Sequence, residues 1–199
     1  MKSIMLLLAL LSASLTSTGS TADEVSYTVD LSGANEAPPT NSPGVGNGTV
    51  TFDLNLLTMR VAFSFSGLVS TTTAAHIHCC TSLAGLATNV GVASQTPSFG
   101  LFHFRVTSGH MDQTFDLSQP VSYNSAFIFN HGQTVSSALN ALLAGVAEGK
   151  AYLDIHTEAL PGGEIRGFLQ PTAVPVPAAI WLFGSVIGLF SLSRRRSQV

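Results

Sequence analysis

Three histidines and two cysteines are the side chains of this sequence with the clearest capacity to bind a metal ion. His76 and His78 are separated by one residue, Cys79 and Cys80 follow directly, and His156 lies far downstream. Side chains two residues apart on a strand point to the same face. Two imidazoles at this spacing suit copper or zinc. The residues therefore suggest one copper or zinc ion held by His76, His78 and His156.

A second explanation of the same residues needs no metal. The histidines would instead hydrogen-bond to neighbouring backbone and carboxylate groups, while Glu164 and Arg166 form a local ion pair. Binding of a ligand or peptide without a metal is a third alternative. The distance between the histidine nitrogens distinguishes a metal site from the two alternatives. Nitrogen atoms that share an ion at bond lengths near 2 Å lie about 3 to 4 Å apart.

The segment around His156 has the pattern of a hairpin. Pro161-Gly162-Gly163 supplies a turn between two strands, at residues 150–157 and 164–169. We expect a register that sets these side chains opposite each other: Asp154 with Arg166, and His156 with Glu164. Such cross-strand pairs stabilise a hairpin modestly.

The first 22 residues have the features of a secretory signal peptide. Lys2 is followed by an apolar run, Ile4 to Leu11, and by the small residues of a cleavage site, Ser20-Thr21-Ala22. The segment predicts export of the chain, with signal peptidase as a partner.

Residues 173–199 have the features of a membrane address. Val174, Pro175 and Pro177 precede a short apolar run, and three arginines close it: Arg194, Arg195 and Arg196. The apolar run is shorter than the roughly 20 residues of a comfortable membrane span, and the arginines would stay cytoplasmic. We expect a tail that tethers the chain at the outer side of the inner membrane during sorting, before it reaches the cell surface or the extracellular space.

One domain remains between these ends, at residues 23–172. It holds four basic and eleven acidic side chains, a net charge of −7. This charge repels phosphate backbones and argues against nucleic acid as a partner. No Gly-x-Ser-x-Gly sequence marks a nucleophile, which favours a non-catalytic protein.

The adjacent cysteines could be in one of four chemical states in such a domain. They could form a vicinal disulfide, remain free thiols, bridge two molecules, or bind a soft metal. In an exported, oxidising setting free thiols do not persist. We therefore favour a vicinal disulfide of Cys79 and Cys80, with a redox role for the pair as a hypothesis.

Alternation of apolar and polar residues predicts an all-β domain, an antiparallel Greek-key-like sandwich or barrel. The expected strands are 25–31, 50–54, 59–65, 68–77, 101–106, 114–117, 126–130, 150–157 and 164–169. One amphipathic helix is expected at residues 135–147, between Thr134 as its cap and Gly149 as its end. The Gly- and Pro-rich segment 33–48, in which Glu36 is the one charged residue, predicts an exposed loop.

Taken together, the domain resembles the CHRD domain. The resemblance rests on five segments in order: Leu31 to Pro39, Ser66 to Leu68, Ala75 to His78, Lys150 to Thr157, and Pro161 to Gly167. The tail is similar to the PEP-CTERM sorting signal read by exosortase-type enzymes, except that Val176 stands where glutamate is usual. The resemblance implies an all-β fold, export, an exosortase-like partner and surface sorting, and it implies no assigned biochemical activity.

The strand with His76 and His78 is also similar to the copper-ligand strands of copper/zinc superoxide dismutases. However, the segment from Thr81 to Phe99 contains no histidine or aspartate, so it cannot supply the zinc-binding loop of those enzymes. We exclude dismutase activity on this ground.

Two functions follow. The first is an exported, non-catalytic module of the cell surface or extracellular matrix that contacts exopolysaccharide or envelope proteins. The alternative is a metal-binding or redox protein that uses His76, His78 and His156.

Overall fold

The computed structural model describes residues 24–172. The predicted signal peptide and sorting tail lie outside the described residues. Within the described part of the chain, no helix combines the length and apolar character that crossing a membrane requires.

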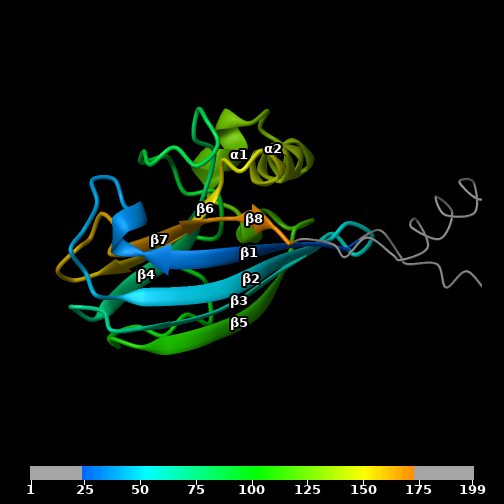
Figure 1. Cartoon of the computed structure of the whole chain (residues 1–199). Helices are drawn as coiled ribbons and strands as arrows, with labels where there is room; N and C mark the ends of the chain where they lie inside the picture. The colour runs from blue at the N-terminus through cyan, green and yellow to red at the C-terminus, as the bar shows by residue number, and fades with distance from the viewer. Residues whose placement is uncertain (1–23, 173–199) are drawn as a thin grey trace, which may run out of the picture.

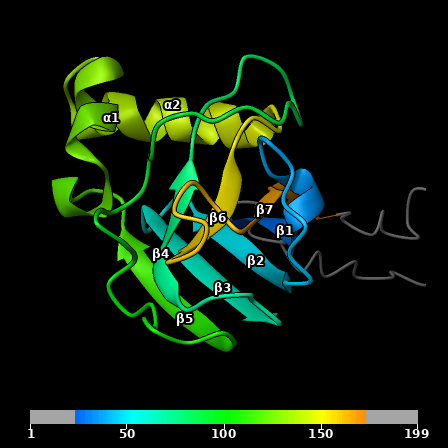
Figure 2. The ribbon, with the colours of Figure 1, turned by 90° about the vertical axis from the view of Figure 1, so that its left-hand side faces the viewer.

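One antiparallel sheet forms the body of the domain. Its strands are β1 (Glu24–Ser32), β2 (Val45–Asp53), β3 (Thr58–Ser66), β4 (Thr72–His78), β5 (Gly109–Asp116), β6 (Tyr152–Thr157), β7 (Ile165–Phe168) and β8 (Gln170–Pro171). They follow the order β4-β6-β7-β1-β2-β3-β5, with β8 paired to β1. The sheet curls into a half-barrel (Figures 1 and 2), so the predicted all-β antiparallel fold is confirmed.

The concave face of the sheet carries the hydrophobic core. Alternate residues of the strands are buried there, among them Phe52, Met59, Val61 and Ile155. Full burial of an aliphatic or aromatic side chain of this size contributes about 1.5–3 kcal/mol. The alternation that predicted the strands thus also fixes which face of each strand meets the core.

The loop between β4 and β5 connects the two ends of the sheet. It donates backbone hydrogen bonds to β4, with Ala93 N 2.9 Å from Ile77 O. It also bonds to β5, where Leu101 N lies 3.0 Å from the Gln113 side chain. Residues 79–108 therefore bridge the gap that the half-barrel leaves between its edge strands.

The predicted strand at residues 101–106 is wrong, because this segment belongs to that loop. Arg105 has a φ of 60°, in the left-handed region that strands do not use. Its N–H is nevertheless bonded to Thr72 O at 2.9 Å, so the segment follows the edge of β4 without forming a strand.

Two α-helices replace the single one expected. Helix α2 (Val135–Ala147) has the predicted bounds, with a capping box between Thr134 and Ser137. Helix α1 (Ser125–Asn130) occupies the segment predicted as a strand at 126–130, so that prediction is wrong. Asn124 caps this helix through the N–H of Ala126, at 2.8 Å. A run this short cannot distinguish helical from strand periodicity.

The segment 33–48 is only partly a loop. Its start forms a short 3-10 helix, η1 (Gly33–Asn35), and β2 already begins at Val45. Glu36, predicted to be exposed, is 2% exposed. A second 3-10 helix, η2 (Pro120–Ser122), follows β5.

Candidate metal centre

A buried polar layer covers the convex face of three neighbouring strands. Residues Ala75, Ile77, Leu153 and Ile155 of β4 and β6 belong to the core, so the residues between them face the other way. These are His76 and His78 on β4, Tyr152, Asp154 and His156 on β6, and Arg166 on β7.

The register of the β6–β7 hairpin confirms one of the two predicted pairs, because the ladder ends at Ile155 with Ile165 and does not include His156 with Glu164. Asp154 pairs with Arg166 on β7. On the other side of β6, Asp154 pairs with His76. The central strand β6 therefore joins the histidines of β4 to the charged residues of β7.

The three predicted metal ligands converge. One ring nitrogen from each of His76, His78 and His156 lies within 4.8 Å of the other two. The ring centroids are 5.2 Å apart for His76 and His156, and 5.7 Å apart for each of the other pairs. This 4.8 Å is an upper limit, and it is wider than the 3 to 4 Å expected between nitrogens that share an ion.

Each histidine uses its other ring nitrogen to bond a backbone carbonyl. The bonds are His76 Nε2 to Pro97 O at 2.6 Å, His78 Nδ1 to Val90 O at 2.8 Å, and His156 Nδ1 to Pro161 O at 3.0 Å. A carbonyl oxygen can only accept, so each of these nitrogens carries a hydrogen. The carbonyls thereby fix the tautomer and the orientation of all three rings.

The other ring nitrogen of each histidine is buried and carries a free lone pair. His76 Nδ1, His78 Nε2 and His156 Nε2 have no hydrogen-bond partner and almost no exposed surface. A buried polar atom without a partner costs about 1–3 kcal/mol and calls for an explanation. A metal ion would satisfy all three nitrogens at once.

Burial also keeps the three rings neutral. It lowers the pKa of His76, and it lowers the pKa of His78 and of His156 to about 4. Neutral imidazole is the form that binds a metal. At neutral pH the site therefore needs to lose no proton before an ion enters.

Tyr152 and the loop residue Val90 hold His78 in place. The Tyr152 ring stacks on the His78 ring, with centroids 4.9 Å apart and planes 3° from parallel. The Tyr152 hydroxyl accepts the N–H of Val90 at 3.2 Å, and Val90 O in turn accepts the His78 N–H. These contacts fix the position of the His78 ring, as hydrogen-bonded partners do for histidines that bind metals.

Arg166 is the centre of the neighbouring charged group. It is fully buried, and its guanidinium lies 4.4 Å from the centre of the Tyr152 ring. It donates to Glu36 Oε2 at 2.6 Å and to Asn89 Oδ1 at 2.6 Å. It also donates to Thr88 O at 3.3 Å. Arg166 thus fastens the loop that carries Val90.

The predicted ion pair between Glu164 and Arg166 is wrong, because Glu36 takes the place of Glu164. The Glu164 carboxylate accepts three other bonds: from Ser42 Oγ at 2.5 Å, from Val69 N at 2.7 Å and from Thr157 Oγ1 at 2.7 Å. A buried carboxylate with this many donors is satisfied without a cation. Glu164 therefore ties two loops to the sheet.

Asp154 is the buried acid without a donor. Neither of its oxygens has a hydrogen-bond partner, and Arg166 Nη2 is 3.6 Å away. Burial and the nearby Glu36 raise the pKa of Asp154 to about 9. Asp154 therefore holds a proton at neutral pH and can donate it in a hydrogen bond to Glu36, which leaves one negative charge opposite Arg166.

The two cysteines are bonded to each other as a vicinal disulfide. Strand β4 ends at His78, so Cys80 does not continue the face of the histidines. The disulfide instead packs against helix α2, where the Cys80 sulfur lies 3.8 Å from Ala141 O. Gly145 lies directly against the pair, and a β-carbon there would overlap both sulfur atoms.

Gly145→Ala is therefore expected to destabilise the protein, although a helix interior usually prefers alanine to glycine. Alanine normally stabilises a helix interior by about 0.5–1 kcal/mol over glycine. Here the overlap with both sulfurs is expected to lower the free energy of unfolding by about 1–3 kcal/mol. Urea denaturation measures the change, with exposed Ala144→Gly as the control for intrinsic propensity. A Gly145→Ala protein more stable than the wild type would contradict this packing.

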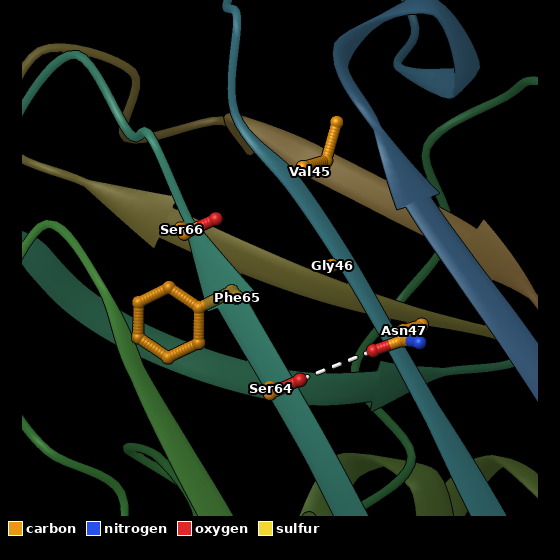
Figure 3. Close-up of a pocket in the computed structure, with 6 residues that line it drawn as sticks. All are labelled: Val45, Gly46, Asn47, Ser64, Phe65 and Ser66. Atoms are coloured by element: carbon orange, nitrogen blue, oxygen red, sulfur yellow. Dashed lines mark hydrogen bonds between the residues drawn. The ribbon is translucent and has the colours of Figure 1, made fainter.

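A separate shallow groove lies on β2 and β3 (Figure 3). Its volume is about 470 Å³, and it is lined by Val45, Gly46, Asn47, Ser64, Phe65 and Ser66. Ser64 Oγ donates to Asn47 Oδ1 at 3.1 Å across it. None of these side chains is titratable or a strong metal ligand, so the groove adds no chemistry to the histidine site.

Sequence reasoning missed two residues of the site, Glu36 and Tyr152. A signal existed for each. Glu36 is the one charge in an otherwise uncharged segment, and Tyr152 shares strand parity with Asp154 and His156. The remaining histidines of the domain, among them His103, do not join the group of side chains in residues 24–172 that could hold a metal ion.

Comparison with known proteins supports the resemblance of the domain. No curated protein and no solved structure matches the chain. The model of the CHRD domain family matches residues 27–169, which is most of the chain and includes every residue of the polar layer. The chain therefore belongs to the CHRD domain family.

Proposed function

We propose that this CHRD domain is an exported module of the cell surface or extracellular matrix that binds one transition-metal ion, copper or zinc. The ligands are His76, His78 and His156. The N-terminal segment 1–22 and the sorting tail 173–199 motivate the export. Signal peptidase, an exosortase-like enzyme, and exopolysaccharide or envelope proteins are the partners that this location implies.

The observation that carries the metal site is the convergence of three buried, unpartnered nitrogens. The rings belong to two adjacent strands, and each is oriented by a carbonyl from a different loop segment. One nitrogen of each ring lies within 4.8 Å of the other two, and one nitrogen of each ring has no hydrogen-bond partner, which bonding to the backbone alone does not explain. The network matches the second shell that orients metal-binding histidines.

The test is metal binding by the full chain with and without a ligand. The wild type, freed of metal and exposed to copper or zinc, is expected to retain about one ion per chain after desalting, and His78→Ala is expected to lose it. His103→Ala removes an exposed histidine outside the group and should bind as the wild type does. His156→Ala repeats the test at a second ligand, and circular dichroism checks that each variant is folded. Sub-stoichiometric metal in the wild type would refute the site.

The contacts of Tyr152 with His78 and Val90 give a finer prediction. Tyr152→Phe keeps the ring that stacks on His78 but removes the hydroxyl that accepts the Val90 N–H. Loss of a second-shell partner typically costs about 10–100-fold in metal affinity, and we expect a decrease at the lower end of that range. Tyr123→Phe is the matched control, since this buried hydroxyl donates to Leu117 O on another part of the fold. Equal affinity of both variants in a chelator competition would contradict the role of Tyr152.

A further inference from the structure

We propose that the three-histidine site selects copper in its monovalent state, Cu(I), over Zn²⁺ and Cu²⁺. This inference rests on the proposed metal site and goes beyond it by naming the ion. Ligand number, ligand charge and burial carry it.

The number of ligands suits Cu(I). Within residues 24–172, the group of side chains placed to bind one ion consists of His76, His78 and His156, with no fourth member. Zn²⁺ in structural sites is almost always held by four protein ligands, and with three protein ligands it keeps a water as the fourth. Cu(I) has a filled d shell and is stable with two or three ligands, so the three imidazoles can complete its coordination.

The charge of the ligands points to the same ion. All three are neutral imidazoles, and none is a carboxylate or a thiolate that would compensate a second positive charge. The cost of moving an ion out of water grows with the square of its charge, so it is about fourfold larger for a divalent than for a monovalent ion. A neutral ligand set therefore penalises Zn²⁺ and Cu²⁺ much more than Cu(I).

Arg166 strengthens this preference. Strands β4 and β7 flank β6, so His78 and the Arg166 guanidinium approach the Tyr152 ring from its two sides, at 4.9 Å and 4.4 Å. The guanidinium is already paired with Glu36. Its fixed charge nevertheless lies one ring away from a ligand, where it repels a divalent ion more strongly than a monovalent one.

Burial also withholds the water molecules that would stabilise a divalent ion. The three free nitrogens have almost no exposed surface. An ion among them is separated from bulk water and cannot keep most of its hydration shell. In a solvent-exposed site copper(II) would bind more tightly than zinc, by the usual order of affinities. A buried site with neutral ligands instead favours the affinity of the monovalent ion over that of either divalent ion.

The experiment compares affinities of the full chain for the three ions. Cu(I) is measured anaerobically by competition with bicinchoninate, and Zn²⁺ and Cu²⁺ by competition with nitrilotriacetate. We expect Cu(I) to bind at least about 1000-fold more tightly than either divalent ion. His78→Ala should abolish Cu(I) binding and His103→Ala should not. X-ray absorption of the Cu(I) form should show nitrogen ligands and no sulfur.

Two outcomes overturn the inference in distinguishable ways. Zinc or copper(II) binding as tight as Cu(I), and sensitive to His78→Ala, would refute the selectivity while leaving the proposed metal site intact. No binding of any of the three ions would refute both. Cu(I) binding that disappears in a Cys79→Ser/Cys80→Ser variant but survives in His78→Ala would assign the ion to the cysteines and would also refute the inference.

Discussion

Replacing Arg166 with methionine is expected to lower the free energy of unfolding by about 3–5 kcal/mol. Arg166 is fully buried, and its partner Glu36 is 2% exposed. Methionine fills much of the same volume, so the dominant effect is electrostatic. Glu36 would lose its cation and would then either stay as a buried negative charge or take up a proton, because burial raises its pKa, and Asn89 and Thr88 would lose their donor. Urea denaturation of the full chain measures the loss.

Two further variants separate this effect from a general loss of charge. Arg60 forms an ion pair with Asp112 on the surface, where the two side chains are 57% and 51% exposed. Exposed pairs contribute about 0–1 kcal/mol, so Arg60→Met should change stability little. Adding Glu36→Gln to Arg166→Met removes the stranded charge and should recover part of the loss. A double variant no more stable than Arg166→Met would show that the arginine acts through packing and not through its charge.

The second large effect is expected at Gly163, where Gly163→Ala should lower the free energy of unfolding by about 2–4 kcal/mol. Gly163 has a φ of +125°, which a side chain rarely tolerates. An added β-carbon would also lie 2.7 Å from Asp154 Oδ1 and 2.8 Å from Glu36 Oε2. Backbone strain and overlap with the two acids therefore act together.

The neighbouring glycine is a close control. A β-carbon at Gly162 meets no atom within 4 Å, and its φ lies outside the left-handed region. Gly162→Ala should leave the free energy of unfolding unchanged or raise it by up to about 1 kcal/mol, because alanine lowers the conformational entropy of the unfolded chain. Thermal or urea unfolding of the two variants side by side checks the prediction. Equal effects at the two positions would contradict the close approach of Gly163 to the acids.

Local patterns predicted the parts of the fold that local forces determine. Helix α2 has the predicted bounds because its apolar spacing, its Thr134 cap and its terminating glycine agree. The hairpin register of Asp154 with Arg166 followed from a short turn between two alternating strands. His76 and His78 share a face for the same reason. The family-level conclusion followed because five short segments occur in the right order.

Long-range contacts explain most of what was missed. The partner of Arg166 stands 130 residues away in a segment without any local signal for burial, so the nearer Glu164 was the natural but wrong choice. The carbonyls that orient the histidines belong to Val90, Pro97 and Pro161, and a backbone oxygen leaves no mark in a sequence. Segment 126–130 failed for a different reason, because five residues are too few to establish a period.

The loop of residues 79–108 also bears on how the domain avoids pairing with other copies of itself. Strands β4 and β5 end the sheet, and an uncovered edge strand is a template for pairing with another molecule. The loop bonds to the backbone of β4 through its own backbone, and it reaches β5 through the Gln113 side chain. A single protease cut within it would release both edges at once. We therefore expect nicking at this loop to be followed by self-association through the released sheet edges.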